Sequence, residues 1–340
     1  MQSTGASKIL HNKLLICLHN LSVTFMNNKP PKAPFNTSQS LASIQIENIV
    51  KMIENTSEPA FHITESTTGY EHIEFSSLSE LFFNIQHLLS IHTDHYEYSE
   101  HLQLFWRACS EVGLERSPVG PVCLDPTGLY YLSFHSSMNE LVNRVRQLTR
   151  EPGYRRKASD RSYQARQREA DVETYTRAVL NRYSRTVVVR VDLHYLEIVD
   201  PLLRIEDLFK DLATLIRSRE RNPIFEYETG YIWSVEQGKN KGFHIHTAFF
   251  FNSAHVYSDW HKAQEIGALW EKITGGRGYF FNCNADKQKY TKLGIGTIKR
   301  ADTQACENVI NTMRYLAKEE QYLRIKPTRA RTFGMGHFPY

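Results

Sequence analysis

Two histidines stand one residue apart in the segment WSVEQGKNKGFHIHTAFFF, which covers residues 233–251. The rest of the segment is rich in apolar and aromatic residues, which is typical of a buried β-strand. Side chains at positions i and i+2 of a strand point to the same face, so His244 and His246 are expected to lie side by side. Imidazole nitrogens are common ligands of metal ions. The spacing therefore makes this pair a candidate metal site.

A carboxylate precedes the two histidines across a predicted hairpin. If the turn GKNKG at 238–242 is centred on Asn240, Glu236 lies opposite His244 on the same face. A set of two imidazoles and one carboxylate suits Mn²⁺ or another transition ion better than Mg²⁺. Magnesium stays an alternative, because phosphate oxygens and water could complete its octahedron. We predict a divalent-metal site, Mg²⁺ or Mn²⁺, formed by Glu236, His244 and His246.

A segment near the C-terminus carries a candidate nucleophile. ENVINTMRYLAKEEQYLRI, at 307–325, has helical spacing and is predicted to form one helix ended by Pro327. Tyr315 and Lys318 then share a face, to which Tyr322 returns two turns later. A phenol is a weak nucleophile until its ionised form is favoured, as a nearby ammonium does. The alternative, that Tyr315 only packs the helix, stays open because the chain holds 18 tyrosines.

The elements that must position these residues alternate from residue 184 onward. Strands are expected at 186–196, 224–237, 242–252, 276–283 and 294–301. Amphipathic helices are expected at 204–220, 260–274 and 307–325. The tight turn at 238–242 requires at least part of the sheet to be antiparallel. The predicted fold class is α+β, with a central, largely antiparallel five-stranded sheet covered by helices.

The chain before this domain is expected to have three parts. Residues 1–40 are predicted to be a poorly ordered lead-in, and residues 41–150 a helix-rich region of unknown role. Residues 151–183 are predicted to form a basic helical linker. From Arg150 to Arg190 there are eleven Arg or Lys against five Asp or Glu. This helix is either a solvated linker or an element that faces phosphates, and the residues alone leave both readings open.

Composition excludes several classes of protein. The net charge of the 340 residues is only +4, so any nucleic-acid surface must be a local concentration of charge. The five cysteines form no C-x-x-C pair, which argues against a disulfide framework or a zinc ribbon and favours a reducing cytoplasm. No apolar run approaches the length of a membrane span, so no membrane partner is expected.

The motifs together resemble those of the HUH endonucleases, named for a His-hydrophobic-His pair. The closer resemblance is to the gene-two-type replication initiators of inoviruses and to their prophage relatives of the YagK/YfjJ type. It rests on RVDLHY, WSVEQGKNKGFHIH, GIGTIK, RYLAKEEQYLR and RTFGMG, in this order across residues 184–335. These residues are therefore expected to form an HUH nuclease domain of the Rep type. The N-terminal half shows no resemblance of this kind.

The resemblance implies a function in rolling-circle replication of a phage, prophage or plasmid. His244, His246 and Glu236 would hold the metal. Tyr315 would attack a phosphodiester of single-stranded DNA at the origin, forming a 5′-phosphotyrosine link and freeing a 3′-OH, and Lys318 would assist. The expected setting is the cytoplasm of a bacterial host cell, with a host helicase and polymerase as partners.

The resemblance also bears on the second tyrosine. On one continuous helix Tyr322 would lie about 10 Å from Tyr315, too far for both phenols to act on one phosphate. A single-tyrosine enzyme is therefore favoured, with Tyr322 as an alternative second nucleophile. Asp192 and His194 on the first strand form another i, i+2 pair, expected either near the metal as outer-shell groups or in packing.

Basic residues are expected to gather around the site and hold the DNA strand. They are Lys239 and Lys241 at the hairpin tip, Lys299 and Arg300 after the fifth strand, and Arg324, Lys326, Arg329 and Arg331 beyond the candidate nucleophile.

Two alternatives to a replication initiator stay open. One is a transposase or relaxase with the same chemistry. The other is a catalytically silent HUH-fold protein that binds origin DNA or a replication partner.

Overall fold

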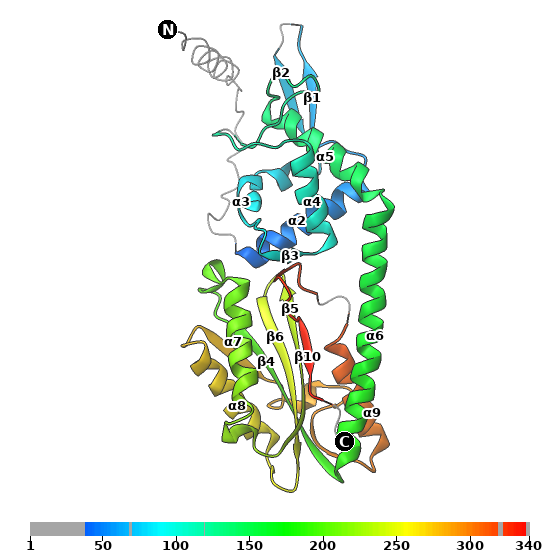
Figure 1. Ribbon diagram of the computed structural model, residues 1–340, viewed down its shortest axis with the longest axis vertical. Helices are drawn as coiled ribbons and strands as arrows, with labels where there is room; N and C mark the ends of the chain where they lie inside the picture. Colours follow the sequence, from blue (N-terminus) through cyan, green and yellow to red (C-terminus); the bar gives the residue numbers. More distant parts are fainter. Residues whose placement is uncertain (1–37, 68–69, 119, 319–321, 338–340) are drawn as a thin grey trace.

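The computed structural model describes residues 38–67, 70–118, 120–318 and 322–337 (Figure 1). Residues 1–37, which make up most of the predicted lead-in, lie outside this description. A helical N-terminal unit sits above a unit built on one large sheet, and a long helix runs beside both. The candidate metal ligands belong to the sheet unit.

The helix-rich region predicted at 41–150 has its own hydrophobic core. Its first helix begins after Ser38, whose hydroxyl accepts a hydrogen bond from the Leu41 amide and so caps the helix. A β-hairpin projects from the far end of this unit (Figure 1). The elements are α2 (Gln39–Asn55), β1 (Phe61–Glu65), β2 (Glu71–Phe75), η1 (Ser79–Phe82), α3 (Ile85–Ser90), β3 (Tyr96–Tyr98), α4 (Glu100–Glu111) and α5 (Phe134–Thr149).

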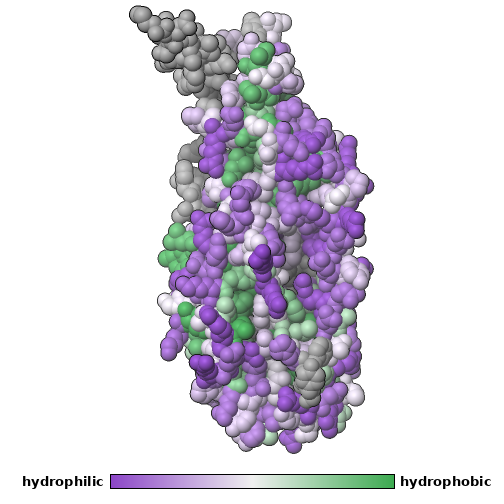
Figure 2. Space-filling model, in the orientation of Figure 1, coloured by the Kyte–Doolittle hydropathy of each residue, from purple (hydrophilic) through white to green (hydrophobic). Residues whose placement is uncertain are grey.

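The segment predicted as a basic linker is one helix of 31 residues, α6 (Pro152–Arg182). Its outer surface is mainly hydrophilic (Figure 2). Its second half also buries an apolar stripe against α9 (Thr303–Tyr315) and the sheet, formed by Val172, Tyr175, Val179 and Leu180. The hydroxyl of Tyr175 accepts a hydrogen bond from the Tyr231 amide of the sheet. The helix is therefore part of the sheet unit and more than a solvated connection.

The sheet unit confirms the predicted α+β class and its antiparallel sheet. Five strands lie in the order β10 (Phe333–Met335), β5 (Glu228–Gly238), β6 (Gly242–Asn252), β4 (Arg185–Tyr195) and β7 (Gly278–Asn282). β8 (Gly296–Lys299) pairs with the first residues of β4. The five strands expected from the sequence are all present, and β10, from the RTFGMG segment, is the sixth. A separate pair, β3 with β9 (Ile325–Pro327), links the two units.

Alternation along the strands sends the two faces of the sheet into different environments. Phe243 and Ile245 pack with α7 (Ile205–Ser218) and α8 (Asp259–Ile273). Ala248 and Phe250 point the other way and pack against α6 and α9. Figure 1 shows the sheet between these two pairs of helices. His244 and His246 are on the α6 and α9 face, because they alternate with Phe243 and Ile245.

The predicted helix at 307–325 is too long. The helix α9 ends at Tyr315, and Leu316 and Ala317 follow in turns whose amides donate to Met313 and Arg314 carbonyls. Beyond residues 319–321, which lie outside the described residues, the chain passes to β9 and the N-terminal unit. Tyr322 is therefore not on the helix of the candidate nucleophile Tyr315, and the expected two-turn spacing is wrong.

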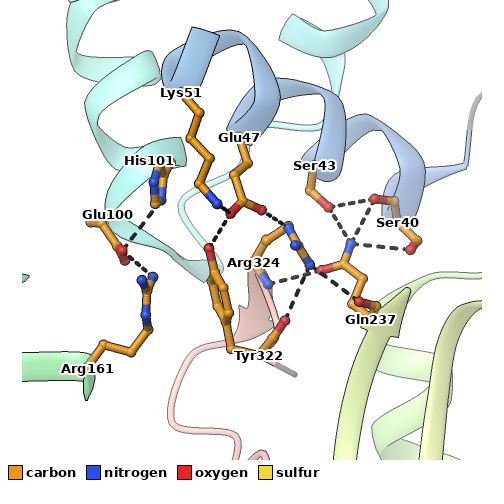
Figure 3. Close-up of polar contacts among 10 residues, drawn as sticks. All are labelled: Ser40, Ser43, Glu47, Lys51, Glu100, His101, Arg161, Gln237, Tyr322 and Arg324. Atoms are coloured by element: carbon orange, nitrogen blue, oxygen red, sulfur yellow. Dashed lines mark hydrogen bonds and ion pairs between the residues drawn. The ribbon is translucent and has the colours of Figure 1, made fainter. Parts of the chain in front are cut away.

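A buried polar network holds this segment against α2 (Figure 3). The carboxylate of Glu47 accepts hydrogen bonds from the Tyr322 hydroxyl at 2.7 Å, from the Arg324 guanidinium and from the Lys51 ammonium. The Gln237 amide donates to Ser43 Oγ at 2.6 Å, and its oxygen accepts from the Arg324 backbone. Gln237 directly follows the candidate ligand Glu236. The N-terminal unit therefore fixes the end of β5 next to the candidate metal site.

The Glu47–Arg324 pair makes a testable contribution to stability. We expect Glu47→Ala to lower the free energy of unfolding by about 3–5 kcal/mol, because it leaves the Arg324 charge buried without its partner. Urea unfolding measures the change. In the control, Lys51→Met, the loss should be below about 1 kcal/mol, since the Lys51 side chain is half exposed. Equal effects of the two substitutions would contradict this account.

The same carboxylate gives stability a defined pH dependence. Burial alone would raise the pKa of Glu47, but Arg324, Lys51 and Tyr322 outweigh it and lower the pKa from 4.5 to about 2. A pKa lowered by folding stabilises the protein above the unfolded pKa, and this contribution disappears as pH falls through the folded pKa. The stability difference between wild type and Glu47→Gln should be constant above about pH 5 and shrink toward pH 2. Unfolding curves at several pH values would contradict this if the difference grew on acidification.

Candidate metal centre

The hairpin of β5 and β6 brings together the three predicted ligands. Glu236 pairs with His244 across the hairpin, the register expected for a turn centred on Asn240. Glu236 Oε2 lies 3.0 Å from His246 Nε2 and 3.6 Å from His244 Nε2. One ligand atom from each residue lies within 4.8 Å of the others. This buried group could hold a metal ion.

Both imidazole rings are oriented by contacts on their far side. His244 Nδ1 donates to the Gly242 carbonyl at 3.1 Å, and His246 Nδ1 lies 2.6 Å from Asp192 Oδ1. Gly242 has a φ of 57°, which glycine adopts without strain. Each Nε2 therefore faces Glu236. A carbonyl or carboxylate behind each ring is the usual arrangement around histidines that bind metals, so the donor set fits a divalent cation.

Strand β4 supplies the groups behind this triad. Arg190, Asp192 and His194 alternate along it and share the face of the ligands. The Arg190 guanidinium lies 3.4 Å from the Asp192 carboxylate. Asp192 thus lies in contact with His246, where a residue that orients a metal ligand would lie. Arg190 was not among the predicted site residues, although a charged side chain two positions before Asp192 in a valine-rich strand indicates the same face.

The carboxylates of Asp192 and Glu236 lie on either side of His246 and stabilise positive charge on its ring. Burial alone would lower the pKa of His246, but hydrogen bonds to Asp192 and Glu236 raise it to about 9. Burial alone would raise the pKa of Glu236, and its hydrogen bonds to the two histidines lower it instead. Burial, followed by the charge of His244, lowers the pKa of His194 to about 4. A divalent cation that binds where His246 Nε2 meets Glu236 would therefore displace the proton that the two carboxylates hold on this imidazole.

The candidate nucleophile lies at the end of the helix that covers the same sheet face. Tyr315 is the last residue of α9, and its side chain is 43% exposed. The Lys318 ammonium lies 4.7 Å from the centre of the Tyr315 ring, so these two predicted residues are neighbours. Val309 and Met313 of α9 pack in the same cluster as Ala248, which follows His246 by two positions on β6. Tyr315 is thus partly exposed at the end of a helix that covers the same face of the sheet as the three candidate ligands.

Comparison with known families adds the identity of this unit. Residues 151–336 match the family model of the YagK/YfjJ C-terminal domain. The chain belongs to this family, which is associated with prophages. The match begins at the residue before α6 and ends just after β10, so the YagK/YfjJ domain comprises the long helix and the whole sheet.

Other comparisons add no relative. Neither the curated proteins nor the solved structures contain a match to the chain. Among the residues that the structure describes, no helix combines the length and the hydrophobicity needed to cross a bilayer.

Few of the basic residues expected around the site of the YagK/YfjJ domain are near it. Lys239 and Lys241 are exposed at the hairpin tip beside Gly242. Lys299 on β8 instead lies opposite Arg185 in the backbone pairing of the sheet, at the far end of β4. Seven residues separate Arg185 from Asp192, which is about 20 Å of strand. The expected gathering of Lys299 and its neighbour Arg300 around the site is therefore wrong.

The residues after the nucleophile helix face the N-terminal unit instead of the site. Arg324 binds Glu47, and Lys326 pairs with Glu97 at 2.7 Å. Burial and the neighbouring Glu47 carboxylate strongly raise the pKa of Tyr322, which disfavours its phenolate. Arg324 and Lys326 thus act as interface residues, and the geometry offers no support for Tyr322 as a second nucleophile.

The outer-shell role of Asp192 predicts a measurable loss of metal affinity. We expect Asp192→Asn to weaken Mn²⁺ binding by about 10–100-fold, because the carboxylate no longer orients His246 and strengthens it as a ligand. Isothermal titration calorimetry gives the dissociation constant. The matched control is Asp211→Asn, another buried carboxylate, which binds Tyr195 and Arg277 away from the site. Equal losses in both variants would contradict the assignment.

Proposed function

We propose that the YagK/YfjJ domain of this chain is an HUH-type nuclease that cuts and rejoins single-stranded DNA through a 5′-phosphotyrosine intermediate. Its biological role in this proposal is to initiate rolling-circle replication at the origin of a phage, prophage or plasmid. One observation carries the proposal. The buried Glu236–His244–His246 group lies on the sheet face that α9 covers, and α9 ends in the partly exposed Tyr315 with Lys318 beside it.

In this reaction Tyr315 supplies the attacking oxygen. The phenolic oxygen bonds to phosphorus, the bond from phosphorus to the 3′ oxygen breaks, and the leaving 3′ oxygen takes up a proton as the phenol gives its own to solvent. The Lys318 ammonium, 4.7 Å from the ring centre, is close enough to assist the attack. Attack by a 3′-OH on the phosphotyrosine reverses the step and rejoins a strand.

The three candidate metal ligands act on the scissile phosphate and not on the tyrosine. Glu236, His244 and His246 would hold a divalent ion, which would supply Lewis-acid polarisation and orientation of the scissile phosphate. Two imidazoles and one carboxylate favour Mn²⁺ over Mg²⁺. Asp192 and the Gly242 carbonyl keep both rings aimed at this point.

The proposal is tested by incubating the full chain with labelled single-stranded oligonucleotides and Mn²⁺ or Mg²⁺. A covalent protein–DNA adduct that survives denaturing electrophoresis is expected, and chelator should abolish it. Duplexes of the same sequence should give less adduct. Absence of an adduct on all single strands tested, including those from the native origin, would contradict the proposal.

One observation favours a second candidate function. The three ligands are only 3–5% exposed, which restricts access of a phosphate to them. A domain that binds origin DNA or a replication partner, such as a host helicase or polymerase, without cutting needs no such access. If the domain only binds DNA, single-stranded DNA should bind without forming a covalent adduct, and Tyr315→Phe should bind it as tightly as wild type does.

A further inference from the structure

Two exposed aromatic rings stand beside the metal-binding group on β7, the last strand on its side of the sheet. Tyr279 pairs with His194, and Phe281 pairs with Asp192, so both side chains point to the ligand face. Tyr279 is 40% exposed and Phe281 is 46% exposed. The residue between them, Phe280, packs against α8 and the core on the opposite face. Core packing therefore does not account for the two outer rings.

A stack of rings connects Tyr279 to a metal ligand. The Tyr279 and His194 rings lie 5.1 Å apart at 19°, and the His194 and His244 rings lie 5.4 Å apart at 14°. His194 Nδ1 is buried with no hydrogen-bond partner among the described residues. The position of His194 therefore depends on stacking. The exposed end of this row is Tyr279, so the row runs from the surface directly to the ligand group.

Positive charge accompanies the second ring. The Lys289 ammonium lies 4.1 Å from the centre of the Phe281 ring, a cation–π contact. Lys289 is exposed, and so is Lys292 in the same loop. A phosphate backbone that passes beside Phe281 would meet the Lys289 ammonium. The rings and the lysines thus offer both contacts that unpaired nucleotides need.

We propose that Tyr279 and Phe281 form a stacking platform for unpaired bases of the single strand whose phosphate enters the metal-binding group. This inference rests on the proposed function and names the surface that holds its substrate. Exposed aromatic faces bind unpaired bases of any sequence, whereas the faces of paired bases are covered in a duplex. The platform leads into a site whose ligands are themselves buried. It therefore selects single strands and sets the side from which they approach.

The platform is tested by fluorescence anisotropy with a labelled fifteen-residue oligothymidylate and the full chain in chelator, so that binding is measured without cutting. Tyr279→Ala and Phe281→Ala should each weaken binding by about 5- to 150-fold, the range for one stacked base. Tyr279→Phe and Phe281→Tyr keep the rings and should bind like wild type. Tyr257→Ala, at a ring that is 84% exposed in the loop before α8, is the control and should have no effect.

The outcomes separate the platform from the proposed function. Binding of the double alanine variant within about twofold of wild type, a difference below about 0.4 kcal/mol, would overturn the platform, and wild-type adduct formation would then still support the nuclease. Loss of binding in that variant without any wild-type adduct would support the platform and contradict the nuclease. Failure of wild type to bind the oligonucleotide would overturn the platform. A 2-aminopurine base in the strand should change fluorescence on binding to wild type, and an unchanged signal would count against stacking.

Discussion

Tyr315→Phe is expected to lower the rate of covalent adduct formation by at least about a thousandfold, as loss of a catalytic nucleophile does in other enzymes. The substitution removes only the phenolic oxygen that bonds to phosphorus in the proposed reaction. Because the Tyr315 side chain is 43% exposed, loss of its hydroxyl should leave the fold intact. The rate is measured from the denaturation-resistant adduct formed with a labelled single strand and Mn²⁺.

The control for this prediction is Tyr322→Phe. That hydroxyl binds Glu47 in the interface with α2, so its loss should affect stability while most of the adduct remains. Binding of the same strand in chelator should be unchanged in Tyr315→Phe. An adduct that persists in Tyr315→Phe at the wild-type rate would assign the nucleophile to another residue.

Removal of a metal ligand should have a comparably large effect. Glu236→Gln and His244→Ala are each expected to weaken Mn²⁺ binding by more than about a hundredfold, beyond the 10–100-fold typical of residues that only orient a ligand. Each variant should also lose the adduct, since the scissile phosphate is then neither polarised nor oriented. Calorimetric titration gives the affinity, and the electrophoretic assay gives the activity.

A histidine outside the site provides the control for the ligand variants. His261 is exposed on α8, on the opposite side of the sheet, and His261→Ala should retain both metal binding and activity. Wild-type metal affinity in Glu236→Gln would show that the carboxylate is not a ligand. Loss of activity in His244→Ala with unchanged metal affinity would assign that histidine another role.

The sheet and its ligand group could be predicted because local rules determine them. Period-two alternation assigns His244 and His246 to one face, and the short turn between Gly238 and Gly242 fixes the partner of Glu236. A slip of one residue would have moved Phe243 and Ile245 out of the core beneath α7 and α8 and put the two histidines into it, so the register is strongly specified. The same alternation along β4 puts Arg190 and Asp192 on one face. Arg190 could therefore have been predicted to share the ligand face together with Asp192.

The end of the nucleophile helix was not predictable from periodicity. Leu316, Ala317, Leu323 and Ile325 continue an apolar spacing that suits a helix. They are buried in the structure, but Leu316 and Ala317 pack with α9 while Leu323 and Ile325 pack on the other side of the sheet. Hydrophobic spacing reports burial and does not show which core receives a residue. Tyr322 was misplaced for that reason.

The basic residues show a similar limit. Sequence reveals the positive charge of Arg324, but not that its partner is Glu47, 277 positions away. A charge that is buried in an ion pair does not contribute to a DNA-binding surface. Lys239 and Lys241 could be placed near the site because a short hairpin fixes them there, whereas Lys299 and Arg300 depended on the order of strands in the sheet.

The most direct test of the central claim is peptide mapping of the protein–DNA adduct by mass spectrometry. The wild-type chain is incubated with a single strand and Mn²⁺, the adduct is digested with nuclease and protease, and the modified residue is located. The account predicts a 5′-phosphonucleotide on Tyr315 that is absent in Glu236→Gln. A nucleotide on another tyrosine, or the same link formed in chelator, would contradict it.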